Sequence, residues 1–264
     1  MGKASQPPGP ARRWLRVTLW TAAGVSTLLA AREVKQRVLD DPRFVVHGLY
    51  ADAENSQDFA IGGLQYASRA RVVRVFQGDF GKNVFRVPIA ERRRQLLAID
   101  WVADASVSRL WPNRIVVRIW ERKPVAFVSV PRDPAHPQTS RLALIDRDGV
   151  ILEQPARARF SFPVVRGVYE QQPEAERREK MHHMLRLFDE LGPLGKDISE
   201  VEVSSSDLRV TMQVSGRAVD LILGSRNFSK RMRNFLEYYQ EIHKRSPGVT
   251  SFDLRLDDRI TARE

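Results

Sequence analysis

The longest apolar run of the chain lies near its N-terminus and predicts a helix that spans a membrane. Residues 14–31 read WLRVTLWTAAGVSTLLAA, and Arg16 is their only charge. A helix of these 18 residues is about 27 Å long, slightly shorter than a hydrocarbon core of about 30 Å. Arg16 and Arg32 can extend to the two interfaces, and Trp14 suits the headgroup layer. We therefore expect a transmembrane helix over residues 14–32, with these three side chains as its anchors.

The residues on either side of this run set its expected orientation. Residues 1–13 are rich in Pro and Gly and poor in apolar groups, which predicts a disordered tail. No acid precedes Glu33, whereas Lys3 and Arg12 lie before the run, so we expect the N-terminus in the cytoplasm. A cleaved signal peptide is the alternative, but TLLAAR is a poor cleavage site. A retained anchor, a stalk over residues 33–56 and an extracytoplasmic remainder are therefore expected.

Between residues 57 and 124 the pattern changes from alternating to helical and back to alternating. Ile115, Val117 and Ile119 occupy every second position, as in a half-buried strand. Ser68 can cap one helix, and Pro88 suits the start of another. Strands are expected at residues 58–65, 102–110 and 114–121, helices over about 68–76 and 88–97, and a turn into an extended piece at 78–85. The order β-α-α-β-β predicts a small sheet with helices on one face.

Residues 125–260 are richer in strands and contain two amphipathic helices. Strands are expected at residues 127–130, 142–152 (a hairpin), 198–203, 208–214, 218–223 and 251–256, and helices at 174–191 and 228–244. The hairpin turn reads D-R-D-G, but an EF-hand loop needs a glycine at its sixth position and a late glutamate, so calcium binding is excluded. The fold class is therefore α+β: one N-terminal transmembrane helix, a small β-α-α-β-β domain and a larger mixed β-sheet domain.

The charge balance and the absence of cysteine narrow the function classes. Lys and Arg number 43 against 32 Asp and Glu, a formal charge of +11. The basic residues are scattered and matched locally by acids, with no basic helix for a phosphate track. A solvated basic surface near an acidic membrane is therefore favoured over nucleic-acid binding. Without cysteine the chain has no disulfide and no thiolate chemistry, and its compartment stays open.

The search for catalytic or metal-binding side chains yields no candidate. His182 and His183 are adjacent, so on a helix they point about 100° apart and cannot share a metal as an i, i+4 pair does. No G-x-S-x-G, phosphate-binding loop or dinucleotide fingerprint occurs in the sequence. We therefore expect no enzyme activity, no catalytic residue, no metal and no cofactor.

Residues 99–127, IDWVADASVSRLWPNRIVVRIWERKPVAF, resemble the end of the POTRA domain in the FtsQ/DivIB family of bacterial cell-division proteins. Further segments similar to that family follow in the same order: GKNVFRV at 81–87, LALIDRDGVIL at 142–152, FPVVRG at 162–167 and FDLRLDDRI at 252–260. Two positions depart from the family pattern. Asp100 stands where proline is usual, and Leu256 stands where some members carry an aromatic residue.

The resemblance implies a single-pass inner-membrane scaffold of the division septum, with its bulk in the periplasm. A POTRA domain would span residues 57–124 and an FtsQ-type β domain 125–260, followed by a tail at 261–264. The implied partners are FtsB and FtsL-like division proteins, with other division components contacting the POTRA and transmembrane regions. Neither nucleic acid nor a small-molecule substrate is expected. The alternative is a POTRA-type chaperone module of an outer-membrane assembly or secretion system.

In the family, FtsB adds a strand beside the last strand of the distal domain, which implies a binding edge at the C-terminus. An unpaired edge strand offers main-chain groups that an incoming strand can satisfy. The residues so implied are Phe252, Leu254, Arg255, Leu256, Asp257, Arg259, Ile260, Thr261 and Ala262. The alternative is a closing strand with solvated charges. Glu121, Arg122 and Pro124 are expected to form an interdomain hinge, where the proline ends the strand.

Overall fold

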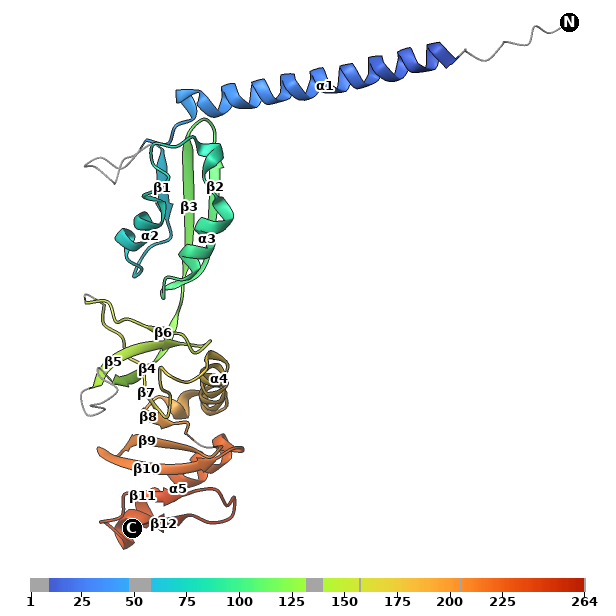
Figure 1. The fold of residues 1–264 in the computed structure, drawn as a ribbon. Helices are drawn as coiled ribbons and strands as arrows, with labels where there is room; N and C mark the ends of the chain where they lie inside the picture. The colour runs from blue at the N-terminus through green and yellow to red at the C-terminus, as the bar shows by residue number, and fades with distance from the viewer. Residues whose placement is uncertain (1–9, 48–57, 132–139, 157, 205, 264) are drawn as a thin grey trace, which may run out of the picture. The chain divides into compact units, whose positions relative to one another are not determined.

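A computed structural model describes residues 10–47, 58–131, 140–156, 158–204 and 206–263 (Figure 1). The chain divides into two compact units. Unit 1 contains residues up to 64, 68–99 and 104–120, and unit 2 contains 65–67, 100–103 and the chain from 121 onward. Unit 2 is thus assembled from three separate stretches of sequence.

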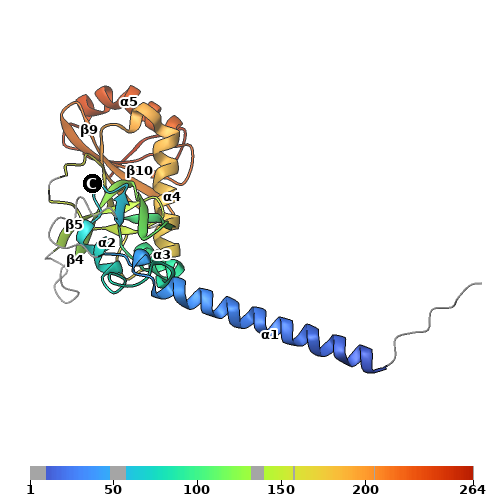
Figure 2. The ribbon, with the colours of Figure 1, turned by 90° about the horizontal axis from the view of Figure 1, so that it is seen from above.

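The N-terminal helix α1 spans Pro10–Asp40 without interruption (Figure 2). It begins four residues before the predicted start at Trp14 and ends before Pro42, where proline was expected to stop it. Large apolar side chains on its described part are exposed: Leu19, Trp20, Val25, Leu28, Leu29 and Val34.

No helix among the described residues combines the length and the apolar character that crossing a membrane requires. The predicted transmembrane span over residues 14–32 is therefore not confirmed. The uncharged run between Arg16 and Arg32 has 15 residues, which as a helix is about 22 Å long and shorter than a hydrocarbon core of about 30 Å.

Unit 1 has the predicted β-α-α-β-β order. Its elements are β1 Phe59–Gly62, α2 Arg69–Phe76, α3 Ile89–Leu97, β2 Val102–Leu110 and β3 Arg114–Glu121, with short 3₁₀ helices at Pro42–Phe44 (η1) and Val84–Arg86 (η2). The strands form a sheet in the order β1-β3-β2, and β1 runs parallel to β3. Ile115, Val117 and Ile119 are buried, as their alternation predicted.

The segment predicted to become extended after residue 78 is instead a turn followed by η2. Asn83 explains the difference, because its Oδ1 accepts a hydrogen bond from the N–H of Phe85 at 2.9 Å and so starts a helical turn. The Nδ2 group of Asn83 donates to the carbonyl oxygens of Val38 and Leu39 at 2.9 and 3.1 Å. One asparagine therefore both starts η2 and satisfies two carbonyls at the end of α1.

A buried ion pair joins the loop after α2 to helix α3. Asp79 is 0% exposed. Its Oδ2 accepts from Nε of Arg92 at 2.5 Å and its Oδ1 from an Nη of the same guanidinium at 2.8 Å. The carboxylate raises the pKa of Arg92 above its usual range. This two-point contact holds the α2–α3 connection against α3.

Unit 2 is built on a nine-stranded mixed sheet in the order β12-β11-β10-β9-β8-β7-β4-β5-β6. Its strands are β4 Pro124–Pro131, β5 Ser140–Asp146, β6 Ile151–Leu152, β7 Val164–Arg166, β8 Ile198–Glu202, β9 Leu208–Val214, β10 Arg217–Gly224, β11 Ser251–Asp253 and β12 Thr261–Arg263, and its helices are α4 Glu174–Leu191, η3 Gly192–Gly195 and α5 Phe228–Arg245. The β4–β7, β7–β8 and β10–β11 pairs are parallel, and β4–β5, β5–β6, β8–β9, β9–β10 and β11–β12 are antiparallel.

Helices α4 and α5 pack their apolar stripes into one core with the sheet. Met181, Met184 and Leu187 from α4 and Phe228 and Phe235 from α5 are almost completely buried in this core. Their spacing is that of one helix face, as the sequence predicted. The core places α5 beside the last strands, β10 to β12, where the predicted partner-binding residues lie.

The D-R-D-G turn is a structural hairpin loop. Asp146 is buried, and its Oδ1 accepts from the N–H groups of Asp148 and Val150 at 2.9 and 2.8 Å. Gly149 has a φ of +79°, and a Cβ there would lie 2.6 Å from the backbone nitrogen of Arg178. The Asp146 carboxylate therefore holds the turn. Glycine is required at position 149, where the turn contacts α4.

Candidate partner-binding edge

The C-terminal residues close the large sheet. Strand β11 covers only Ser251–Asp253, and β12 pairs with it antiparallel, with Ser251 opposite Arg263 and Asp253 opposite Thr261. The strand expected at residues 251–256 is therefore shorter than predicted, because β12 lies outside β11 and the residues between the two strands form a loop. Within the described part of the chain, β12 is the last strand on this side of the sheet.

The main-chain bonds of β11 show which groups of β12 point outward. The carbonyl of Thr250 accepts from Asp220, and the N–H of Leu254 donates to Ile222, at 2.8 and 2.9 Å. The main-chain N–H and C=O groups of the even-numbered residues of this segment therefore point toward β10. Those of Ser251 and Asp253 point toward β12. Ala262 lies opposite Phe252, so its N–H and C=O point away from β11, toward the free edge.

The predicted partner-binding residues occupy three environments. Phe252 and Leu254 are buried in the core beside α5 and are not available to a partner as side chains. Leu256 is 53% exposed. The remaining residues lie on the loop or on β12 with partly or fully exposed side chains: Arg255, Asp257, Arg259, Ile260, Thr261 and Ala262.

One buried arginine, which the sequence analysis did not single out, holds the loop between β11 and β12. Arg231 of α5 donates from Nε to Oδ1 of Asp257 at 2.8 Å and from its two Nη groups to the carbonyls of Leu223 and Arg255, both at 2.6 Å. The position of Arg231 in the sequence indicates that it is buried, because it lies three residues after Phe228 on the buried face of the helix. A guanidinium at such a position has to find acceptors inside the fold.

Charge pairs fix both ends of this loop. Arg231 holds the pKa of Asp257 below its usual range, with a further hydrogen bond from Asn227 at 2.9 Å. Arg255 forms a two-point contact with Asp253 and a third bond to Asp207, which raise the pKa of Arg255 and lower that of Asp253. The loop is therefore held in one conformation by contacts of the chain itself.

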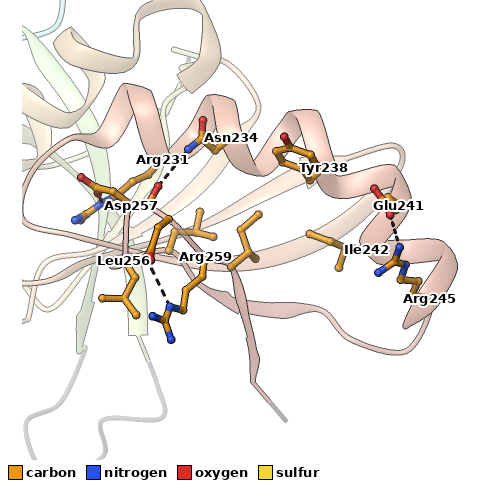
Figure 3. Close-up of a pocket in the computed structure, with 12 residues that line it drawn as sticks. Arg231, Asn234, Tyr238, Glu241, Ile242, Arg245, Leu256, Asp257 and Arg259 are labelled. Atoms are coloured by element: carbon orange, nitrogen blue, oxygen red, sulfur yellow. Dashed lines mark hydrogen bonds and ion pairs between the residues drawn. The ribbon is translucent and has the colours of Figure 1, made fainter.

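A groove of about 320 Å³ lies between this loop and α5 (Figure 3). Tyr238 and Ile242 line it from the helix, and Leu254, Leu256 and Ile260 line it from the loop. Charged groups surround these apolar side chains, including the Glu241–Arg245 pair at 2.5 Å. A partner side chain entering the groove would meet an apolar floor with a charged rim.

We expect the loop between β11 and β12 to loosen only in strong acid. Because the folded pKa of Asp257 is below its ordinary value of 3.8, the ionised carboxylate stabilises the loop above that value, and the contribution is lost as pH falls through the lowered pKa. Amide hydrogen exchange of residues 254–260 should therefore be constant from pH 7 to pH 5, after correction for intrinsic rates. Loosening between pH 7 and pH 5 would contradict this assignment.

The predicted hinge residues make fixed contacts inside unit 2. The carboxylate of Glu121 accepts from the consecutive N–H groups of Gln65, Tyr66 and Ala67 at 2.7–2.9 Å. Arg122 donates to Asp146 at 2.8 Å, and its N–H bonds to the carbonyl of Trp101 at 2.9 Å. Pro124 is the first residue of β4.

Replacement of Glu121 with alanine should destabilise unit 2 by about 2 kcal/mol, because three main-chain donors lose a charged acceptor and two of them are partly buried. Hydrogen exchange of the amides in β4 and β5, measured across a urea series, reports on unit 2 and measures the loss. Glu121→Gln is the matched control, since it keeps one acceptor oxygen and should lose less. Equal stability of the alanine variant and the wild type would refute the stabilising role of the Glu121 carboxylate.

The predicted membrane anchors all lie in α1. Arg32 is exposed on the helix. The side chains of Trp14 and Arg16 fall outside the described residues, so only their position in the helix is established.

Comparison with known proteins matches both units. Residues 55–122 match the family model "POTRA domain, FtsQ-type", and residues 135–255 match "Cell division protein FtsQ/DivIB, C-terminal". The chain is 37% identical over 214 residues to the cell division protein FtsQ of Koribacter versatilis, covering 78% of this chain and 59% of that protein. It is 28% identical over 203 residues to FtsQ of Nitrosospira multiformis and 27% over 208 residues to FtsQ of Neisseria meningitidis, covering 76% of this chain and 78% of each relative. The chain therefore belongs to the FtsQ/DivIB family of cell division proteins.

Proposed function

We propose that this protein is a non-enzymatic scaffold of the bacterial division machinery that links other division proteins to FtsB and FtsL-like partners. The observation that carries the proposal is the match of both units, in order, to the two FtsQ-type family models. Its relatives are named cell division proteins. A scaffold acts through surfaces, so its binding edge takes the place of an active site.

We place the FtsB-like partner along the outer edge of β12. The outward N–H and C=O of Ala262 support this placement, because an added strand would complete their hydrogen bonds. The exposed Leu256 and the adjacent groove could then receive side chains of the partner. Arg259 and Asp257 would form the charged rim, which contributes to specificity more than to affinity.

Helix α1 is the proposed attachment to the inner membrane, with the N-terminus in the cytoplasm and the two units in the periplasm at the septum. The exposed apolar side chains Leu19, Trp20, Leu28 and Leu29 support this, since water is an unfavourable environment for them. The basic residues before the helix support the orientation.

Binding of the full chain, held in detergent, to the matching periplasmic FtsB–FtsL segments tests the proposal. Saturable binding that survives physiological salt is expected. The competing chaperone function predicts binding to unfolded outer-membrane strands instead. A chain that binds such strands and ignores FtsB–FtsL would overturn the scaffold proposal.

A further inference from the structure

Unit 1 carries an exposed group of apolar side chains that no contact within the described chain covers. It consists of the exposed Phe85, Leu110 and Trp111 together with the buried Phe44 that packs against two of them, and is called the aromatic tip below. The ring centroid of Phe44 lies 5.5 Å from that of Phe85 and 5.1 Å from that of Trp111. Phe44 is buried beneath the other two, whereas Trp111 is 76% exposed. The exposed ring of Trp111 therefore lies on a packed aromatic base.

Polar contacts hold the aromatic tip in place. The Nδ2 group of Asn113 donates to the carbonyl of Val45 at 3.3 Å and to Asp58 at 2.8 Å, which ties the turn after β2 to the segment after η1. Arg109 donates to the carbonyl of Val87 at 2.6 Å. Exposure of Trp111 is thus a feature of an ordered turn, because both flanks of the turn are bonded to the body of unit 1.

The aromatic tip lies directly beside the C-terminal end of α1. Phe44 follows the last residue of the helix by four positions. Asn83, two residues before Phe85, donates to carbonyls of the last helical turn, and Arg86 pairs with Asp40 at 3.1 Å. The exposed apolar side chains of α1 and the aromatic tip therefore belong to one continuous part of the molecule.

Basic side chains surround the aromatic tip. Lys82, Arg109 and Arg114 are exposed around it. The nearby acids are paired: Asp40 with Arg86, Asp41 with Arg43, and Asp58 with Asn113 and His47. An aromatic centre with a basic rim matches the headgroup layer of an anionic bilayer, where tryptophan and arginine are both favoured.

We propose that the aromatic tip docks into the headgroup layer of the same bilayer that holds α1, so that unit 1 rests on an anionic membrane surface. The inference rests on the proposed attachment through α1. The lengths agree: α1 continues eight residues, about 12 Å, beyond Arg32, and a headgroup layer is about 5–8 Å thick. The side chain of Trp111 spans part of the difference between these two lengths. The basic rim and the direct connection to α1 favour a lipid surface over a peptide as the occupant of the tip.

Quenching of tryptophan fluorescence by brominated lipid tests this. The full chain is reconstituted in vesicles of brominated phosphatidylglycerol and phosphatidylcholine. One variant, Trp14→Phe/Trp20→Phe/Trp120→Phe, keeps Trp101 and Trp111. The matched control, Trp14→Phe/Trp20→Phe/Trp111→Phe, keeps Trp101 and Trp120. Trp101 is buried in both, and Trp120 is 51% exposed but lies six strand residues, about 20 Å, from Arg114, where β3 begins after the turn that carries Trp111.

The first variant should lose at least a third of its emission in brominated vesicles, whereas the control should lose under a tenth. Quenching should also fall when neutral lipid replaces the phosphatidylglycerol. Vesicle flotation of each variant reports separately on α1. Flotation without quenching of Trp111 would overturn the docking and leave the attachment standing, and would point to a protein partner for the tip. Loss of flotation by the wild type would overturn both.

Discussion

Replacement of Asp79 with alanine is expected to lower the free energy of unfolding of unit 1 by about 3–5 kcal/mol. Removal of Asp79 leaves the Arg92 guanidinium with the longer ion pair to the half-exposed Glu91, at 3.6 Å. Here Arg92 keeps only 15% of its side-chain surface exposed, so water can replace the carboxylate poorly. Both hydrogen bonds from its guanidinium to Asp79 are lost at once. The connection between α2 and α3 would lose its main polar contact.

Because the chain has two units, a single unfolding curve does not isolate this effect. Hydrogen exchange of the amides in α2 and α3, measured across a urea series, reports on unit 1 alone. Asp104→Ala is a matched control, since it removes an equally short pair with Arg93 at 2.6 Å that is about half exposed. The control should cost under about 1 kcal/mol. Similar losses for the two variants would contradict the assignment of a strong buried pair.

The double variant Asp79→Leu/Arg92→Met separates the cost of a stranded charge from the value of the pair. Apolar replacement of both partners of a buried pair is often neutral. We therefore expect this variant to recover most of the stability lost by Asp79→Ala.

Substitution of Ala262 by proline is expected to weaken binding of the periplasmic FtsB–FtsL segments at least tenfold. The N–H of Ala262 points away from β11, so proline removes a donor that the fold itself does not use. An added strand would lose that hydrogen bond and meet the proline ring at its centre. Fluorescence anisotropy of a labelled partner segment measures the change in affinity.

Ala262→Val is the matched control for this edge. It keeps the N–H and adds a side chain that strands favour, so binding should stay within about twofold. Hydrogen exchange in β10 and β11 establishes that the proline variant stays folded. Unchanged affinity of a folded Ala262→Pro variant would place the partner elsewhere on unit 2.

The sequence predicts best those elements whose side chains alternate between core and solvent. Strands β2 and β3 have the predicted bounds, because buried branched residues such as Ile115 and Val117 determine both period and face. Helices α4 and α5 are found for the same reason, through their apolar stripes. In these segments local pattern and tertiary packing agree.

The C-terminal edge of the large sheet was only partly predictable, because main-chain pairing decides which strand lies there. Strand β12 reads Thr-Ala-Arg, which has no apolar alternation, and its place comes from pairing with β11. Leu254 and Leu256 are two residues apart and would lie on the same face of a continuous strand. Only Leu254 is buried, because the strand ends at Asp253. Arg231 was missed because its acceptors are carbonyls, which composition does not reveal.

The discontinuous make-up of unit 2 limits how family members can exchange parts. Residues 65–67 and 100–103 belong to unit 2, where Glu121 and the bond from Trp101 Nε1 to the carbonyl of Glu153, at 2.9 Å, hold them. A chimera joined after residue 120 would bring these two segments from one parent and their acceptors, Glu121 and the carbonyl of Glu153, from the other. Grafting the POTRA unit between relatives therefore requires those seven residues to come from the same parent as the distal domain, so a single junction cannot exchange the two units.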